Sequence, residues 1–344
     1  MEIAAKEIGS EFSTTNESSA QGITLPTTSS SSFVFSGRTA IETVIKNTSI
    51  HKIAFPSYCC DSMLAPFRDA GIDVSFYDVH FDDGFKVELC TAVDVDAILW
   101  CNYFGFRVPM PDLSEFKSNG GIVIEDITHS FMSDEMYHLQ SDYLVASLRK
   151  WEPIICGGYC TSVKGVFDGV PDKAPDKSFI DLKRSAMNLK REYLQTGDER
   201  LKPRFLSMFK EANEWLAHNY SGLTIDDYSR EYLETADISA HREIRRGNAV
   251  ALYDGLKDIE FIKPLFDIED MDCPLFVPVI IDKDLRNKVR QKLTDNKIYC
   301  PIHWPKPNAD CSSNLYDMEL SLICDQRYGE LDMKRIISVL REIN

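Results

Sequence analysis

The stretch Ile122-Val123-Ile124-Glu125-Asp126 sets the interpretation of the whole chain, because an apolar run ends there in two carboxylates. A short apolar run that follows Gly121 is typical of a buried strand. Successive side chains of a strand point to opposite faces, so we expect Glu125 and Asp126 to point away from each other. A carboxylate at such a strand end can hold a cation or a protonated ring nitrogen. A helix cap or a surface charge remains open at this point.

Short strands and helices alternate around this stretch. The pattern predicts helices over 40–46, 61–70 and 112–117, and further strands over 52–55, 73–78, 96–101, 143–147 and 158–163. Such alternation favours an α/β fold whose large domain has a mainly parallel sheet of the seven-stranded type, covered on both faces. Ligands on such sheets bind at the carboxyl ends of the strands.

The chain divides into three predicted parts. Residues 1–32, which contain many Ser and Thr, are predicted to form an N-terminal arm or loop, and residues 33–240 the large domain. Residues 241–344 are predicted to form a smaller C-terminal α/β domain. Helical spacing extends over 180–196, 203–220 and 226–256, and the small domain is predicted to have strands over 275–281 and 297–301 and a final helix over 331–343.

Composition excludes several classes of function. The 344 residues include 38 Lys and Arg against 54 Asp and Glu, a net charge of −16, which disfavours nucleic acid and anionic membranes as partners. The first residues lack the apolar core of a secretory signal, and the ten cysteines are scattered. We therefore expect reduced thiols, a cytoplasmic location and no metal site.

Three other features fall at the predicted ligand edge of the sheet. The segment Ser36-Gly37-Arg38-Thr39 opens a helix, where free N–H groups favour an anion, although a simple N-cap remains possible. Lys150 follows a buried strand beside Trp151, where desolvation favours a nucleophilic amine, although most lysines are surface residues. Gly157-Gly158 permits a close backbone approach or only a turn.

Together these features suit pyridoxal 5'-phosphate. Its phosphate needs a helix terminus, its pyridine nitrogen needs a carboxylate, and its aldehyde needs a Lys amine for the Schiff base. The order along the chain, with an anion site, Asp126, Lys150 and then two glycines, supplies each of these groups.

The sequence also resembles a known family over most of the chain from Phe35 onward. The matching stretches are Ser-Gly-Arg-Thr-Ala-Ile at 36–41, Phe-Pro-Ser-Tyr at 55–58, Asn-Tyr-Phe-Gly at 102–105 and Glu-Asp-Ile-Thr-His-Ser at 125–130. They continue with Lys150 followed by Gly157-Gly158, with Arg-Arg-Gly-Asn-Ala at 245–249 and with Ile-His-Trp at 302–304. These stretches are similar to those of the DegT/DnrJ/EryC1/StrS sugar aminotransferases, within the fold type I pyridoxal-phosphate enzymes.

The resemblance implies roles for individual residues. Lys150 would form the Schiff base and carry the proton between substrate and cofactor. Asp126 would bind the pyridine nitrogen, and His129 would lie near the ring hydroxyl. The phosphate contacts would come from Gly37, Arg38, Thr39 and Ser147.

Some positions depart from the family pattern. Ser147 lies three residues before Lys150, where the family has Ser five residues before its Lys. Cys60 stands where relatives have the aromatic residue that stacks on the cofactor, so either this thiol or Tyr58 is expected there. His303 and Trp304 would face the substrate, or else lie in a surface loop. Arg327 would bind a substrate carboxylate, or else form a structural ion pair.

The sequence therefore predicts an aminotransferase that moves an amino group from glutamate to the keto group of a nucleotide-linked sugar. The active sites of fold type I enzymes form between subunits, so the resemblance also implies a homodimer. Two alternatives remain. One is a pyridoxal-phosphate lyase or decarboxylase of an amino acid, and the other is a non-catalytic protein that binds the cofactor or a nucleotide sugar.

Overall fold

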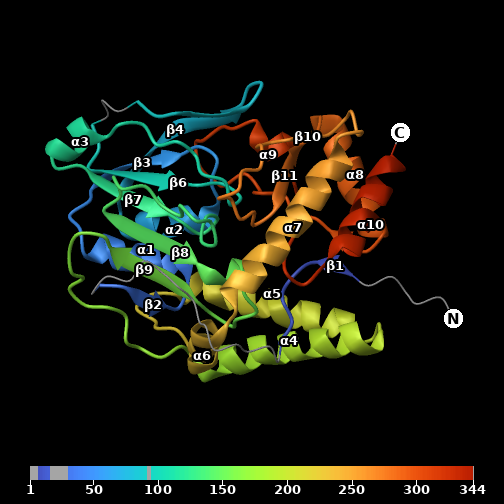
Figure 1. Cartoon of the computed structure of the whole chain (residues 1–344). Coiled ribbons are helices and arrows are strands. Elements are labelled where there is room, and N and C mark those ends of the chain that lie inside the picture. Colours follow the sequence, from blue (N-terminus) through green and yellow to red (C-terminus); the bar gives the residue numbers. More distant parts are fainter. Residues whose placement is uncertain (1–6, 16–29, 91–93, 344) are drawn as a thin grey trace.

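The computed structural model describes residues 7–15, 30–90 and 94–343, which fold into an α/β structure with one large and one small layered region (Figure 1). The large region is built on an eight-stranded sheet with the strand order β2-β9-β8-β7-β6-β3-β4-β5. The bounds of these strands are β2 Ser32–Val34, β3 Lys52–Pro56, β4 Asp73–Phe81, β5 Phe85–Glu88, β6 Ala97–Cys101, β7 Ile122–Asp126, β8 Tyr143–Ser147 and β9 Gly158–Ser162.

The five central strands of this sheet run parallel, as the sequence predicts. Strands β4, β3, β6, β7 and β8 pair in parallel, whereas β5, β9 and β2 pair antiparallel at the two edges. The prediction of a mainly parallel sheet is confirmed, with eight strands rather than seven. The short hairpin of β4 and β5 carries alternating exposed residues, which is why β5 lacked the apolar signal of the inner strands.

Helices cover both faces of the sheet and form two separate cores. One face packs against α1 (Gly37–Lys46) and α2 (Asp61–Asp69), with α3 (Ser114–Ser118) nearby. The other face packs against α4 (Lys177–Thr196), α5 (Lys202–His218) and α6 (Asp227–Thr235). In β8 the side chain of Val145 joins the first core, and those of Leu144 and Ala146 join the second, as the alternation of a strand requires.

The helical stretch predicted over 226–256 is two helices. Helix α6 ends at Thr235, Ala236 is extended, and the Asp237 side chain accepts the N–H of Ala240 to begin α7 (Ile238–Leu256). Asp favours an N-cap over a helix interior, so this local bond outweighs the helical spacing.

The small region contains the antiparallel sheet β10-β11-β13, formed by Lys263–Pro264, Val277–Ile280 and Glu319–Leu322. Helices α7, α8 (Lys283–Asp295) and α10 (Glu330–Arg341) supply its core, and α9 (Leu315–Met318) leads into β13. The short strand β1 (Ile8–Gly9) pairs in parallel with β12 (Ile298–Tyr299), so the segment 7–15 docks on this region. Residues 1–6 and 16–29 of the predicted N-terminal arm lie outside the described residues.

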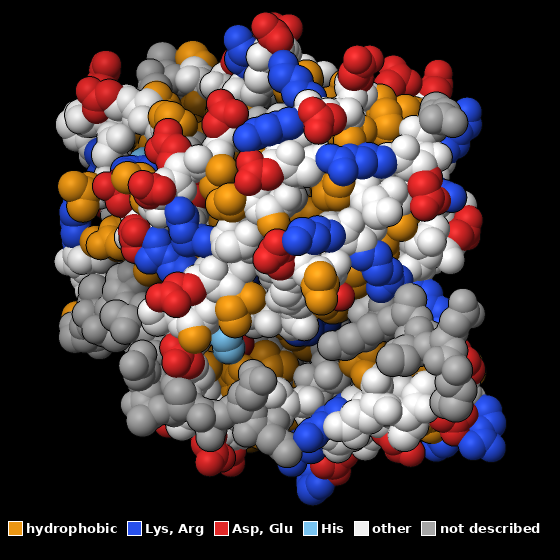
Figure 2. Space-filling view, turned by 45° about the vertical axis from the view of Figure 1, so that its right-hand side comes forward, with side chains coloured by type: hydrophobic (Ala, Val, Ile, Leu, Met, Phe, Trp, Pro, Cys, Tyr) orange, Lys and Arg blue, Asp and Glu red, His pale blue; other side chains and the backbone are white. Residues whose placement is uncertain are grey.

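The surface shows acidic and basic side chains interspersed over the face drawn in Figure 2. None of the helices described is both long and apolar enough for a bilayer crossing. The ten cysteines all fall in the described ranges, and each is a free thiol. Across those same ranges, no cluster of His, Cys, Asp and Glu is suited to a metal ion.

Candidate active site

A cavity lies where the carboxyl ends of β7 and β8 meet the start of α1, at the sheet edge that the sequence predicts. We call it the cradle cavity. It is lined by Ser36, Gly37, Arg38, Ile41, Cys60, Ser62, Met63, Asp126, Thr128, Val145, Ala146, Ser147, Arg149 and Lys150. Six of the twelve predicted site residues line this cavity, namely Gly37, Arg38, Cys60, Asp126, Ser147 and Lys150. Thr39 belongs to the same helix start but not to the lining.

Glycines let the first turn of α1 approach the sheet closely. A Cβ on Gly158 would lie 2.2 Å from the carbonyl oxygen of Ser36, and a Cβ on Gly37 would lie 3.1 Å from the Cβ of Ser147. Ser36 caps the helix by accepting the N–H of Thr39. The Thr39 hydroxyl instead donates to the carbonyl of Tyr220 at 2.8 Å, so this side chain fixes the helix start and does not line the cavity.

Two guanidinium groups face the cradle cavity without a hydrogen-bond partner for their Nε atoms. These belong to Arg38 and Arg149, and neither side chain forms an ion pair within the ranges described. Burial, together with the charge of Arg149, lowers the pKa of Arg38 below its ordinary value. Two unpaired cations beside the N-terminus of a helix make a strong site for a multiply charged anion such as a phosphate.

Asp126 is the carboxylate of this cavity. One of its oxygens accepts the N–H of Thr128 at 2.8 Å, and only 5% of the residue is exposed. Burial raises the pKa of Asp126 above its ordinary value, although the bond from Thr128 and the charge of Lys150 oppose this shift. Glu125 points to the other face, where His138 and Ser141 donate to it. A cationic ring nitrogen would stabilise the ionised form of Asp126.

Lys150 lies in a polar and aromatic environment in the turn after β8. Its Nζ is 3.4 Å from Nε2 of His129 and 5.7 Å from the centre of the Trp304 ring. The Nδ1 atom of His129 accepts the backbone N–H of Phe104 at 3.0 Å, so the neutral ring carries its proton on Nε2. Burial, with Lys150, lowers the pKa of His129 well below its ordinary value. His129 therefore lies beside Lys150 as a neutral ring with its proton on Nε2.

The two candidates for the ring-stacking position lie in different places. Cys60 lines the cradle cavity, with its thiol 3.0 Å from the hydroxyl of Ser62. Tyr58 is fully buried in an aromatic cluster, where it stacks on Tyr103 at 5.6 Å between ring centres, and it does not line the cavity. No aromatic side chain lines the described walls of this cavity.

A second cavity, of about 280 Å³, adjoins the first. We call it the adjoining cavity, and it shares Arg149 and Lys150 with the cradle cavity. His303 lines it, together with residues 10–12 of the N-terminal segment. Lys150 thus stands where the two cavities meet, with Asp126 on one side and His303 on the other.

Arg327 also lines the adjoining cavity, but its guanidinium is already used. It forms a two-pronged ion pair with Asp325, at 2.8 and 2.7 Å, and donates to the carbonyls of Ser10 and Glu11. Its cation also lies 4.1 Å from the ring centre of Phe12. The structure therefore places Arg327 as an anchor of the N-terminal segment, the structural alternative that the sequence left open.

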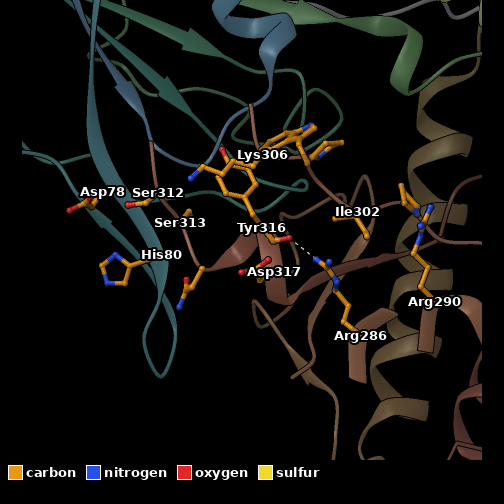
Figure 3. Close-up of a pocket in the computed structure, with 14 residues that line it drawn as sticks. Asp78, His80, Arg286, Arg290, Ile302, Lys306, Ser312, Ser313, Tyr316 and Asp317 are labelled. Carbon is orange, nitrogen blue, oxygen red and sulfur yellow. Dashed lines mark hydrogen bonds between the residues drawn. The ribbon is translucent and has the colours of Figure 1, made fainter. Parts of the chain in front are cut away.

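A third and larger cavity, of about 950 Å³, lies between the β4–β5 hairpin and α8 (Figure 3). Arg286 and Arg290 of α8 and Lys306 bring positive charge to it, and Asp78 and Asp317 bring negative charge. Trp304 lines this cavity and also lies over Lys150, so its ring separates the third cavity from the amine.

Two residues of the cradle cavity were missed in the sequence. Arg149 directly precedes Lys150, and the turn Leu148–Lys150 places both side chains in the cavity. Thr128 holds Asp126 with its N–H, and its hydroxyl accepts the N–H of Ser147 at 2.9 Å. The sequence could have indicated both residues, because each lies within two positions of Asp126 or Lys150.

Solved structures with this fold are known. An aminotransferase TlmJ from Streptoalloteichus hindustanus matches with a TM-score of 0.64 and 13% identity, over 91% of this chain and 85% of that one. A DegT DnrJ EryC1 StrS aminotransferase from Brucella abortus matches at 0.61 and 17%, over 91% and 85%. The sugar aminotransferase Spr1654 from Streptococcus pneumoniae, described as putative and solved in its PLP-form, matches at 0.63 and 12%, over 91% and 88%.

The chain has the fold of these aminotransferases. No protein-family model and no curated protein matches it by sequence. The common fold thus extends over nearly the whole chain at an identity that sequence comparison does not detect.

Proposed function

We propose that this chain is a pyridoxal-phosphate-dependent aminotransferase that belongs to the DegT/DnrJ/EryC1/StrS family. The observation that carries the proposal is that Lys150 lines one cavity together with the carboxylate Asp126 and the two unpaired guanidinium groups of Arg38 and Arg149. The fold shared with solved sugar aminotransferases supports it.

The residues of the cradle cavity fit the cofactor group by group. Arg38, Arg149 and the free N–H groups at Gly37 would hold the phosphate. Asp126 would keep the ring nitrogen protonated, and that contact would relieve the cost of its own burial. Cys60 would lie against the ring in place of the usual aromatic residue.

Pyridoxal phosphate, when bound, supplies an electron-withdrawing ring that stabilises negative charge on a substrate carbon. The protein's own part is to hold groups and move protons. His129 would donate from Nε2 to the ring oxygen, and Lys150 would carry the proton between the two cavities. Trp304 would border the amine on the side of the third cavity, where it would contact a sugar that extends from that cavity toward Lys150.

The substrates are also proposed from the cavities. Glutamate would enter the adjoining cavity as amino donor, and a nucleotide-linked keto sugar would be the acceptor. The cations Arg290 and Lys306 of the third cavity support an acceptor with a diphosphate, since both line a space large enough for one. A homodimer would complete the site with residues from the second subunit.

A single-turnover experiment tests the function. Protein loaded with the cofactor is mixed with L-glutamate, and 2-oxoglutarate is measured against the amount of bound cofactor. We expect about one equivalent of keto acid from the wild type and none from Lys150→Ala. Release of carbon dioxide from an amino acid, or of ammonia together with a keto acid, with the bound cofactor left in its aldehyde form, would instead indicate the lyase alternative.

A further inference from the structure

A buried acid that the proposed function does not use lies behind His303. Glu319 of β13 is fully buried, and no cation of the described chain lies within ion-pair distance of it. Its Oε2 accepts the backbone N–H of His303 at 2.7 Å, and its Oε1 accepts the hydroxyl of Ser321. A buried carboxyl without a cation needs a reason, because its charged form is costly there.

Ser321 connects this acid to the imidazole. Its Oγ lies 2.8 Å from Nδ1 of His303, and Glu319 and Ser321 share one face of β13 because they are two residues apart. The other ring nitrogen, Nε2, has no hydrogen-bond partner in the described ranges, and His303 lines the adjoining cavity with Lys150. The three side chains thus form one line of hydrogen bonds from the cavity to the buried acid.

We propose that His303, Ser321 and Glu319 form a proton relay that makes His303 a second acid–base group beside Lys150. Its use in catalysis rests on the proposed function, but the relay itself requires no cofactor. Of the three residues, His303 lines the cavity, and Ser321 and Glu319 are positioning residues that act through His303.

The relay has two neutral-imidazole states. With Glu319 ionised, Ser321 donates to the carboxylate and accepts the Nδ1–H of His303, which leaves a lone pair on Nε2. When a bound ammonium group gives up a proton, an Nε2–H bond forms, the Nδ1 proton passes to Ser321, and the Ser321 proton passes to Glu319. The substrate gains a free amine, the acid becomes neutral, and the imidazole never carries a charge.

The surroundings favour these two states over a charged imidazole. Burial, together with Lys150, lowers the pKa of His303 to about 3. Burial raises the pKa of Glu319 to about 8, although its bonds to Ser321 and His303 and the charge of Arg286 oppose this. The other titratable groups that face Glu319 are Tyr58 and Cys300, and His129 faces His303.

A fixed structural network would give the same contacts but would not switch, so the test must observe the ring nitrogens. We would record nitrogen NMR spectra of the full chain with ¹⁵N-labelled histidine and without cofactor, and assign His303 with His303→Gln. In the wild type we expect a neutral ring throughout, with its proton on Nε2 at low pH and on Nδ1 at high pH, and a midpoint near the pKa of Glu319, about 8.

Variants separate the relay from general disturbance. Glu319→Gln should abolish the change of tautomer, and Ser321→Ala should uncouple the ring from the acid. Glu152→Gln is a matched control, because Glu152 bonds His241 at 2.9 Å in another buried pair and should leave His303 unchanged. A tautomer that is fixed at all pH values in the wild type, or a ring that titrates to its cation, would overturn the proposal.

A second readout connects the relay to the reaction. In the single turnover with glutamate, His303→Gln should lower the rate by about 10²-fold, the lower range for a positioned acid–base group. Glu319→Gln should remove the rise in rate with pH near 8. A protein whose ring switches but that releases no keto acid would refute the proposed function and leave the relay intact.

Discussion

Lys190 and Lys150 both line cavities of this chain, but their surroundings differ. Lys190 is almost fully buried, and its amine donates to the hydroxyl of Ser10 at 2.7 Å and to the carbonyl of Glu11. Burial, with Arg327, lowers the pKa of Lys190 to about 7. Lys150 is half-buried, and it opens onto two cavities beside Asp126 and Arg149.

A lowered pKa therefore does not by itself mark a catalytic amine. In the Lys190 region every strong cation has a protein partner: Arg327 pairs with Asp325, and Lys183 pairs with Glu11 at 3.2 Å. In the Lys150 region the polar groups converge on open space instead. Groups that the fold leaves unpaired around a cavity indicate a ligand, whereas groups that it pairs hold the N-terminal segment in place.

The largest expected effect is at Asp126. Asp126→Asn removes the charge that would face the ring nitrogen, and losing one partner of a buried ion pair costs about 3–5 kcal/mol. Cofactor affinity, measured by equilibrium dialysis, should fall accordingly. Asp325→Asn, in the Lys190 region, should lower thermal stability and leave cofactor affinity near that of the wild type. Equal losses of affinity in the two variants would mean that Asp126 has no special role in holding the cofactor.

The next effect concerns the guanidinium groups. Arg149→Met should weaken cofactor binding by about 1.5–3 kcal/mol, the contribution of a hydrogen bond to a charged group. Arg327→Met keeps a similar volume but frees Asp325, so its effect should appear in the free energy of unfolding. Titration with pyridoxal phosphate gives the cofactor affinity of each variant, and urea unfolding gives its free energy of unfolding. If Arg149→Met bound the cofactor as well as the wild type, the phosphate site would be misplaced.

The buried acid and the buried amine should shift stability with pH in opposite directions. In the folded state Glu319 keeps its proton up to a pKa of about 8, above the ordinary value of a Glu side chain. Its contribution to the free energy of unfolding therefore falls as the pH rises toward 8. In the folded state Lys190 releases its proton at a pKa of about 7, below the ordinary value of a Lys side chain. Its contribution to the free energy of unfolding therefore rises from pH 7 upward. For each of the two groups, the free energy of unfolding can change by at most about 1.4 kcal/mol per pH unit.

Urea unfolding from pH 5 to 10 measures both slopes. Glu319→Gln should remove the fall, and Lys190→Met should remove the rise. A wild-type curve that Glu319→Gln leaves unchanged below pH 8 would show that this acid is ionised in the folded protein.

The smallest effect is the accessibility of two thiols. Cys60 lines the cradle cavity and is half-buried, whereas Cys90 is exposed and outside it. Cofactor should slow the alkylation of Cys60 and leave Cys90 unaffected, as measured by mass spectrometry of the two peptides. Equal protection of both thiols, or of neither, would mean that Cys60 does not lie against the ring.

The sequence predicted the parts that depend on local patterns. The apolar strands, the helix start at Ser36 and the order Asp126 then Lys150 all follow from periodicity and short motifs. Contacts between distant segments could not be predicted in this way. The bond from Arg327 to the carbonyl of Ser10, and the line from His303 to Glu319, depend on how β13 and the N-terminal segment pack. One sequence carries no signal for that packing.

The most direct test of the account is to find which amine meets the cofactor aldehyde. Protein is incubated with pyridoxal phosphate and reduced with borohydride, and the modified peptide is identified by mass spectrometry. We expect modification at Lys150, which should be lost in Lys150→Ala and kept in Lys190→Ala. Modification at Lys190, or at scattered surface lysines with Lys150 unmodified, would contradict it.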